Sequence, residues 1–268
     1  MTHFFTAYFD TRQYELNARS ELPTSALLRW FQEAATLTSC DAGFGMDCFE
    51  RYKTVWLIRG MTVAHARPIQ YPARIAITSW LSAAHKVRVY REYLARDATT
   101  GEIVARGRAN WVHVHTANFF PTRIPIEAIT RFAPNGISAL TRFEPRPLAP
   151  PGTPREFCAT RRAQRYEADA MQHVNNAIYV DWLEETLAEA VADLTGGARR
   201  LCVHRHDLEY LRSAVPGDAL TLSARLVGAG QCASAWQMEV HRGEELLVRD
   251  RVTALWRDQN GKPLRNKW

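Results

Sequence analysis

The sequence predicts an α+β protein that contains one unit twice, each with a long helix wrapped by an antiparallel sheet. The first observation is an internal repeat: Tyr14-Glu15 recurs as Tyr166-Glu167, and Trp30 recurs as Trp182, each 152 residues later (166 − 14 = 152). The second is that each copy continues into an apolar-periodic segment typical of a helix. The third is that alternating segments, typical of strands, follow each helix. A repeat of this length indicates two domains rather than a solenoid.

The composition is that of a packed globular protein. Of the 268 residues, 46% are hydrophobic and 23% are charged, which suits two domains of ordinary size. No apolar run approaches the length of a membrane span, and the start, Met1 to Phe5, lacks the basic region of a signal peptide. The net charge of +6 favours acidic partners. Nucleic acid fits that charge, but no basic cluster interleaved with aromatic residues supports it.

The cysteines indicate a reducing compartment. They are odd in number and scattered: Cys40, Cys48, Cys158, Cys202 and Cys232. No Cys-x-x-Cys pair occurs, so neither a zinc site nor a disulfide framework is indicated. We therefore expect a cytoplasmic protein. No phosphate-cradling glycine loop is present, and we expect no cofactor.

The first copy, predicted as residues 1–124, reads as one helix followed by four strands. Thr24 or Ser25 is the expected N-cap of a helix from about Ala26 to Cys40. Thr100-Gly101 is the expected hairpin turn before the last strand. The four strands are predicted over about 54–66, 74–83, 86–97 and 102–116.

The second copy, predicted as residues 161–268, repeats this order. Asn175 or Asn176 is the expected N-cap of a helix over 177–194, and Gly196-Gly197 is its expected stop. Arg242-Gly243 is the expected hairpin turn. The apolar face of the helix is predicted from residues at helical spacing: Tyr179, Leu183, Leu187, Ala190 and Leu194. The four strands are predicted over about 200–211, 219–227, 232–241 and 244–256.

A linker is predicted between the two units, over residues 125–160. Prolines make its middle stiff and extended. They are Pro145, Pro147, Pro150, Pro151 and Pro154. Pro134-Asn135-Gly136 is expected to form a turn.

The stretch before the second helix brings reactive groups together. Asp169 and His173 stand four residues apart, just before the helix begins. Backbone N–H groups and the positive end of the helix dipole gather at such an N-terminus, where they can polarise a carbonyl. Asp and Asn in front of a helix are also common as simple caps, so the whole string must support a functional interpretation.

The string His-Val-Asn-Asn at 173–176, preceded by Asp169 and followed by Tyr179 and Trp182, resembles the hot-dog thioesterases. It is most similar to the acyl-acyl carrier protein thioesterases, whose chains carry two hot-dog units in tandem. The resemblance covers nearly the whole chain apart from the linker, and it implies a tandem (double) hot-dog fold. It also implies hydrolysis of acyl-carrier protein or acyl-coenzyme A thioesters, a place in fatty acid biosynthesis, and room for a homodimer of such chains.

The resemblance implies a role for each residue of this string. Asp169 would activate a water as general base or attack directly, and His173 would orient that water or Asp169. Backbone N–H groups near Val174, Asn175 and Asn176 would bind the thioester carbonyl and stabilise the oxyanion. The Asn175 side chain would position the carbonyl or cap the helix.

Two positions depart from the plant-type members of this family. Those members have an Asn two residues before the His, where this chain has Met171. They also have an acidic residue at a place that falls here to Ser213 or Ala214. Asp169 is then expected to act with the helix N-terminus alone, as in simpler hot-dog acyl-CoA thioesterases. A non-catalytic acyl-thioester-binding protein is the alternative.

Glu33 and Ser213 are further candidates for the site. Glu33 and Glu185 occupy matching helix positions, which favours a shared structural role. Some hot-dog enzymes nevertheless place a catalytic acid on this helix, so the resemblance keeps Glu33 as a candidate. A hot-dog dehydratase would need a His followed by a helix acid in a Gly/Pro-rich setting, which Asn175-Asn176 does not resemble.

The remaining patterns predict no second site. His113 with His115, and His204 with His206, share a strand face, but no third ligand is near in the sequence, so no metal is expected. No serine lies in a Gly-x-Ser-x-Gly elbow.

The two copies differ where the chemistry is expected. The offset of 152 places Asn17 opposite Asp169 and Glu21 opposite His173. An Asn side chain is neither a base nor a nucleophile at pH 7, and Glu21 is expected to pair with Arg19 or with solvent. We therefore predict one active site per chain, in the second copy.

Overall fold

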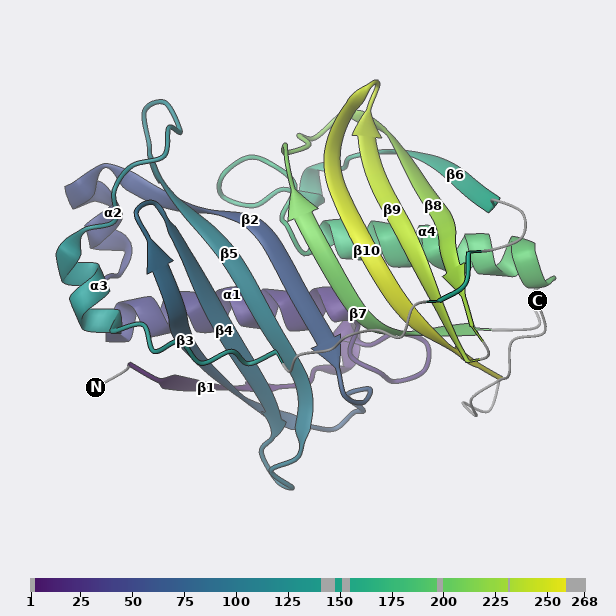
Figure 1. The fold of residues 1–268 in the computed structure, drawn as a ribbon, viewed down its shortest axis with the longest axis horizontal. Helices are drawn as coiled ribbons and strands as arrows, with labels where there is room; N and C mark the ends of the chain where they lie inside the picture. The colour runs from purple at the N-terminus through teal and green to yellow at the C-terminus, as the bar shows by residue number, and fades with distance from the viewer. Residues whose placement is uncertain (1–2, 141–147, 151–154, 197–199, 231, 259–268) are drawn as a thin grey trace. The chain divides into compact units, whose positions relative to one another are not determined.

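The computed structural model describes residues 3–140, 148–150, 155–196, 200–230 and 232–258. The chain divides into two compact units, Met1–Arg142 and Phe143–Trp268. In each unit, the described residues form five strands of antiparallel sheet and one long helix (Figure 1). The predicted α+β class, with two copies of one helix-and-sheet unit, is confirmed.

The first unit begins with β1 (Phe5–Asp10), the short 3₁₀ helix η1 (Gln13–Glu15) and α1 (Thr24–Asp41). The elements that follow are α2 (Met46–Tyr52), β2 (Thr54–His65), β3 (Arg74–His85), β4 (Arg88–Asp97), β5 (Ile103–His115) and α3 (Ile126–Phe132). Its strands lie in the order β1-β3-β4-β5-β2, and all neighbours are antiparallel.

The second unit begins with β6 (Arg155–Arg162), η2 (Arg165–Glu167) and α4 (Ile178–Thr195). The strands that follow are β7 (Arg200–Tyr210), β8 (Ala219–Ala229), β9 (Ala233–Arg242) and β10 (Glu245–Arg257). Their order, β6-β8-β9-β10-β7, reproduces that of the first unit.

The repeat holds at the level of single residues. The 3₁₀ helices η1 and η2 are displaced by the same 152 residues as the sequence motif (165 − 13 = 152). In the sheets, Leu81 of β3 faces Arg91 of β4, and Leu226 of β8 faces Trp236 of β9, so the strand offset is 145 (226 − 81 and 236 − 91). These offsets define which positions of the two units are equivalent.

Each long helix lies across one face of its own sheet and buries one side (Figure 1). The buried positions of α1 recur at helical spacing, as expected for a stripe that faces a core. They include Leu27, Trp30, Phe31, Ala34 and Thr38. On α4 the predicted apolar face is confirmed at Tyr179, Leu183, Leu187 and Ala190, all buried, whereas Leu194 is only partly buried.

The predicted N-cap of α1 is wrong. The helix begins at Thr24, directly after Pro23, and no side chain caps it. Thr24 and Ser25 lie buried inside its first turn. Pro23 has a φ of −67°, which suits the start of a helix and whose missing N–H costs nothing there.

The predicted N-cap of α4 is also wrong. The helix begins at Ile178, and its cap position is Ala177, which offers no side-chain acceptor. Asn175 stands two positions before this cap position, and its Oδ1 accepts the N–H of Ala177 at 3.0 Å. Gly196 ends the helix in the left-handed conformation, with a φ of 60°, as predicted, and Gly197 lies outside the described residues.

The segment 125–160, predicted as a linker, contains α3 and most of β6. Neither these elements nor α2 and β1 were predicted. Both β1 and β6 are edge strands that pair on one side only, β1 with β3 and β6 with β8. Pro145, Pro147, Pro151 and Pro154 lie outside the described residues. No helix among the described residues has the length and apolar content needed to cross a membrane.

Candidate functional site

The loop between η2 and α4 holds Asp169 and His173 close together. The N–H of Asp169 donates to the carbonyl of His173 at 3.0 Å, and the N–H of Gln172 donates to the carbonyl of Asp169 at 2.9 Å. Gln172 lies in the left-handed region, with a φ of 61°. These contacts make a tight turn in which the predicted carboxylate and imidazole project from neighbouring positions.

The Asp169 carboxylate is held through both of its oxygens. The N–H of Met171 donates to Oδ1 at 2.9 Å, and Nδ2 of Asn175 donates to Oδ2 at 3.2 Å. Because Asn175 Oδ1 also accepts from Ala177, this side chain links the carboxylate to the start of α4. The Asp169 side chain keeps 29% of its surface exposed. The carboxylate is therefore both fixed in position and open to water.

The His173 ring lies beside this carboxylate. Its Nδ1 is 3.7 Å from Asp169 Oδ1 and donates to the Val174 carbonyl at 3.3 Å. A carbonyl oxygen only accepts, so Nδ1 carries a proton in this contact. Nε2 has no hydrogen-bond partner within the described ranges. It is therefore free to contact a water or a substrate.

The backbone donors at the helix N-terminus are fewer than predicted. The N–H of Val174 donates to the Ala214 carbonyl at 2.9 Å, and the N–H of Asn175 donates to the Glu167 carbonyl at 3.0 Å. The first acceptor lies after β7 and the second lies in η2. Which backbone groups bond to these two N–H groups is set by the fold and could not be predicted from the sequence pattern. Among the described residues, the N–H of Asn176 has no acceptor. Asn176 is the one predicted donor of the three that remains available.

Buried aromatic side chains hold the loop by hydrogen bonds. Tyr179 accepts the N–H of Ala214 at 2.7 Å, and Tyr210 donates to the carbonyl of Asn176 at 3.1 Å. Burial raises the pKa of Tyr179 to about 12, so its hydroxyl stays protonated and neutral. Trp182 is buried, and its Nε1 donates to the buried carboxylate of Glu167 at 3.0 Å. These contacts fix the position of the loop relative to the core of the unit.

The first unit contains the same loop with different side chains. The N–H of Asn17 donates to the carbonyl of Glu21 at 2.9 Å, and the N–H of Ser20 donates to the carbonyl of Asn17 at 3.0 Å. Ser20 has a φ of 59°, matching Gln172. Glu21 forms an ion pair with Arg19 at 2.8 Å, which confirms that prediction. The backbone of the loop is thus shared, while the acid and the imidazole occur only in the second unit.

The other predicted candidates lie apart from this turn or beside it. Glu33 is exposed on α1 of the first unit, and its role stays a prediction. Ser213 is exposed just after β7. The next residue, Ala214, contacts both Val174 and Tyr179, so Ser213 borders the loop that carries Asp169.

The predicted histidine pairs are engaged in other contacts. His113 is buried, and its Nδ1 lies 3.2 Å and 3.1 Å from the carbonyls of Thr122 and Arg123. Burial lowers its pKa, so the ring is neutral at pH 7. His204 and His206 share β7, but His206 is fully buried and forms ion pairs.

His206 belongs to a buried charged cluster in the second unit. Its Nδ1 is 2.6 Å from Asp250 Oδ2, and its Nε2 is 3.1 Å from Glu184 Oε1. Burial alone would lower the pKa of His206, but the two carboxylates raise it to about 10. The ring is therefore an imidazolium at neutral pH. Its partners lie on α4 and β10, which are far apart in the sequence, so no local sequence pattern indicates this cluster.

Both halves of the chain match known family models. Residues 2–132 match the model described as the acyl-ACP thioesterase N-terminal domain, and residues 171–249 match that of the thioesterase superfamily. The chain belongs to the acyl-ACP thioesterase family. The second match begins at Met171, so it includes His173 and the end of the loop that leads into α4, while Asp169 lies just before it.

Curated relatives carry names of the same family. A palmitoyl-acyl carrier protein thioesterase of Cuphea hookeriana is 26% identical over an alignment of 270 residues, gaps included, that covers 96% of this chain and 63% of that protein. An acyl-[acyl-carrier-protein] hydrolase of Cuphea viscosissima is 26% identical over an alignment of 228 residues that covers 79% of this chain and 55% of that protein. Both names include the word chloroplastic. The chain spans less than two thirds of the length of these relatives.

Solved structures show the same fold. The 12:0-ACP thioesterase from Umbellularia californica aligns with a TM-score of 0.75 at 22% identity, covering 96% of this chain and 94% of that one. An acyl-ACP thioesterase from Bacteroides thetaiotaomicron aligns with a TM-score of 0.75 at 16% identity, covering 95% and 98%. The predicted double hot-dog fold is confirmed.

Proposed function

We propose that this chain hydrolyses acyl thioesters, with acyl carrier protein or coenzyme A as the thiol. A water adds to the thioester carbonyl and the carbon–sulfur bond breaks, which releases a free carboxylic acid and the carrier thiol. The observation that carries this proposal is the Asp169 carboxylate, held by Met171 and Asn175 in front of α4 and still open to water. A carboxylate fixed in this way is suited to take a proton from an attacking water.

The remaining groups of the loop suit the other steps. The free Nε2 of His173 can hold the water beside the Asp169 carboxylate. The N–H of Asn176, at the positive end of α4, can donate to the carbonyl oxygen as negative charge develops there. We assign the oxyanion contact to Asn176 rather than to Val174 or Asn175, because the N–H groups of the latter two are already bonded.

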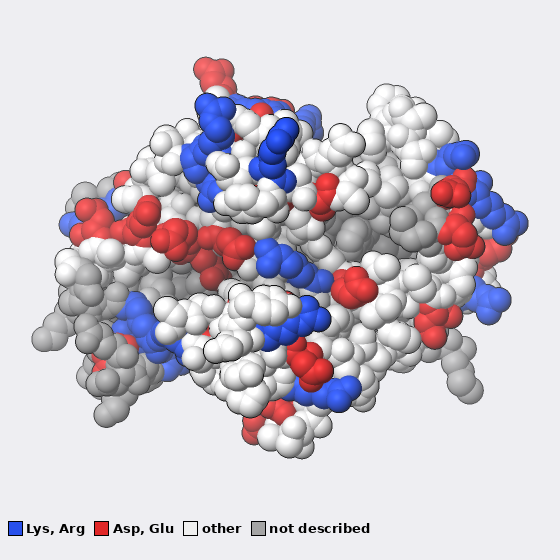
Figure 2. All heavy atoms as spheres, turned by 180° about the vertical axis from the view of Figure 1, so that it is seen from behind, with Lys and Arg blue, Asp and Glu red and all other residues white. Residues whose placement is uncertain are grey.

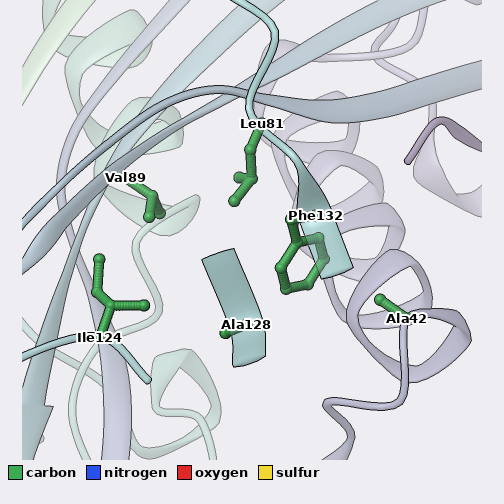
Figure 3. Close-up of a cluster of buried hydrophobic side chains, with 6 residues drawn as sticks. All are labelled: Ala42, Leu81, Val89, Ile124, Ala128 and Phe132. Atoms are coloured by element: carbon green, nitrogen blue, oxygen red, sulfur yellow. The ribbon is translucent and has the colours of Figure 1, made fainter. Parts of the chain in front are cut away.

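The first unit supplies a cavity suited to an acyl chain. Its volume is about 230 Å³, and its walls are largely apolar, as is usual for ligand sites. Apolar residues that line it are Leu81, Val89, Trp111, Ile124, Ile129 and Phe132. Figure 3 shows part of this lining, a buried cluster built from β3, β4 and the α3 region. An aliphatic chain buried here would gain about 0.8 kcal/mol for each CH₂ group.

The thiol carrier is proposed to be acidic. The net charge of +6 favours an acidic carrier protein or the phosphates of coenzyme A. On the face seen in Figure 2, Lys and Arg side chains are interspersed with Asp and Glu rather than gathered in one basic groove. This pattern supports the expectation that nucleic acid is not the partner. All five cysteines are free, which supports the predicted reducing, cytoplasmic environment.

Release of thiol from a panel of acyl thioesters tests the proposal. The purified protein is offered acyl-carrier protein and acyl-coenzyme A of several chain lengths, and free thiol is measured over time. Rapid release supports a hydrolase, and the ratio between the two carriers identifies the thiol. Tight binding of the thioesters without release would instead support the non-catalytic acyl-binding alternative.

Turnover of acyl-carrier protein should fall as salt is added. Salt screens the net positive charge and shortens the reach of its field to about 10 Å at 0.1 M, so steered association slows. Stopped-flow association rates with acyl-carrier protein at increasing salt measure this effect. Rates that do not change with salt would contradict electrostatic recruitment.

Only the second unit should be needed for the chemistry. Replacing Asn17 and Glu21 together by Ala should keep most of the turnover per folded molecule, whereas replacing Asp169 and His173 should remove it. The first pair has a structural cost, because Asn17 Oδ1 accepts the N–H groups of Arg19 and Glu21. Kinetics are therefore compared below the melting temperature of each variant. Equal losses from both pairs at equal folded fractions would contradict a single active site per chain.

A further inference from the structure

A buried positive charge lies in the wall of the first-unit cavity. Arg91 of β4 lines this cavity with only 5% of its surface exposed. Its Nη1 donates to Ser79 Oγ at 3.2 Å and its Nη2 to Ser39 Oγ at 3.4 Å. The guanidinium also lies over the ring of Phe132, 5.3 Å from its centre. The charge therefore sits among two hydroxyls and an aromatic face.

No carboxylate of the described residues forms an ion pair with Arg91. Its neighbour Glu92 is also buried, but it binds Arg108 at 2.6 Å. Burial lowers the pKa of Arg91, yet a guanidinium remains charged in proteins. Of its five N–H groups, the described residues accept two. A buried charge without an opposite charge is costly, so its place beside a cavity calls for an explanation.

The second unit shows that the fold does not need this charge. By the sheet register, the residue equivalent to Arg91 is Trp236 and the residue equivalent to Ser79 is Ala224. The helix offset makes Val191 the equivalent of Ser39 (39 + 152 = 191). All three of these side chains are buried and apolar or aromatic. The Arg91 group is therefore specific to the unit that has the cavity.

We propose that the first-unit cavity binds a carboxylate attached to an apolar chain, with Arg91 as its ion-pair partner. Guanidinium and carboxylate match as two parallel N–H···O hydrogen bonds, and Arg91 has N–H groups to spare for them. The apolar walls formed by Leu81, Val89 and Phe132 accommodate the chain. His113, which also lines the cavity, is neutral and adds no second charge.

Two ligands share this chemistry. One is a free fatty acid, which is the product of thioester hydrolysis. The other is an acyl thioester whose far end carries a carboxylate, the half-thioester of a dicarboxylic acid. The second reading rests on the proposed function, whereas binding of a free carboxylate by Arg91 is independent of it. The experiment separates these cases.

The first arm measures binding to the full chain by titration calorimetry, with decanoate and its neutral counterpart decanol as probes. Wild type should bind decanoate at least about tenfold more tightly, because a charge-assisted hydrogen bond adds to the apolar contacts. Arg91→Met should abolish this preference and bind both probes alike. Arg91→Lys should keep part of it. The control Arg88→Met, an exposed arginine on the same strand, should leave the preference unchanged.

Thermal unfolding gives a second readout. Decanoate should raise the melting temperature of wild type and of Arg88→Met more than decanol does, whereas the two probes should raise that of Arg91→Met equally, since stabilisation follows the affinity of each ligand for the folded state. Should Arg91→Met fail to fold, the comparison of Arg91→Lys with wild type still measures the effect. Equal affinity of wild type for decanoate and decanol would overturn the proposal.

The second arm identifies the source of the carboxylate. The kcat/KM values of decanoyl-coenzyme A and of the coenzyme A half-thioester of decanedioic acid are compared in wild type and Arg91→Met. A preference for the half-thioester that reverses in the variant assigns the site to the substrate. Competitive inhibition by decanoate, without that preference, assigns it to the free acid. If no thioester is turned over, the proposed function fails, and the calorimetric arm still decides whether Arg91 binds a carboxylate.

Discussion

Replacing Asp169 by Asn should reduce thioester hydrolysis on the order of 10²-fold or more, within the range of general base catalysis. The substitution removes the base and keeps the shape of the side chain. The first unit shows that the loop accepts it: Asn17 occupies the equivalent position, and its Oδ1 accepts the N–H of Arg19 at 2.9 Å, as Asp169 Oδ1 accepts that of Met171. Melting temperature should therefore change little.

Steady-state kinetics on a preferred thioester, with the melting temperature measured in parallel, test this prediction. The matched control is Glu21→Gln, which removes a carboxylate from the corresponding loop of the first unit and should leave kcat nearly unchanged. Wild-type activity in Asp169→Asn would rule out this carboxylate as the base or nucleophile. A loss of activity that follows a loss of folded protein would count as a structural effect instead.

Replacing Asp250 by Asn should destabilise the protein by about 3–5 kcal/mol, the usual cost of breaking a buried ion pair. Asp250 and His206 are both fully buried and lie 2.6 Å apart. Without the carboxylate, the imidazolium keeps only Glu184, at 3.1 Å, as a charged partner. Chemical denaturation of the wild type and the variant measures the difference.

A neighbouring aspartate provides the control for this variant. Asp207 is 37% exposed and pairs with Arg205 near the surface, so Asp207→Asn should cost no more than about 1 kcal/mol. Equal effects of the two substitutions would show that the buried cluster is not a special source of stability.

The same cluster makes stability depend on pH in a defined direction. The pKa of His206 is raised from 6.5 in the unfolded chain to about 10 in the folded one. The folded state thus binds a proton that the unfolded state releases above pH 6.5. Its contribution is complete below that pH and is lost as the pH rises toward about 10. The difference in unfolding free energy between wild type and Asp250→Asn should shrink over this range.

The sequence predicted the elements that depend on local pattern. The alternation along β8 places Leu220, Leu222 and Leu226 on one buried face, and such periodicity is visible without a structure. The turns at Gly101 and Gly243 were predicted from their residue types, and both glycines have a positive φ. The repeat at an offset of 152 predicted two equivalent long helices, and Trp30 and Trp182 lie in α1 and α4.

Features that depend on contacts with residues distant in the sequence could not be predicted from it. The edge strand β6, with the sequence REFCATRR, is too polar to be recognised as a strand, and only its pairing with β8 defines it. The sequence of β4 does not indicate that Arg91 is buried, because the cavity beside it is formed by residues from other helices and strands as well. The acceptor of the Val174 N–H, the carbonyl of Ala214, likewise comes from a distant part of the sequence.

The two units differ in how a buried positive charge is balanced. In the second unit two acids form ion pairs with a charged histidine, whereas in the described part of the first unit a charged arginine forms no ion pair with an acid. The unfolding of the two halves of the chain should therefore depend on different solution conditions. The melting of the second half should shift with acidity, and the melting of the first should shift with the concentration of a fatty acid. Differential scanning calorimetry can then separate the two unfolding transitions, since each melting temperature shifts under a condition that leaves the other unchanged.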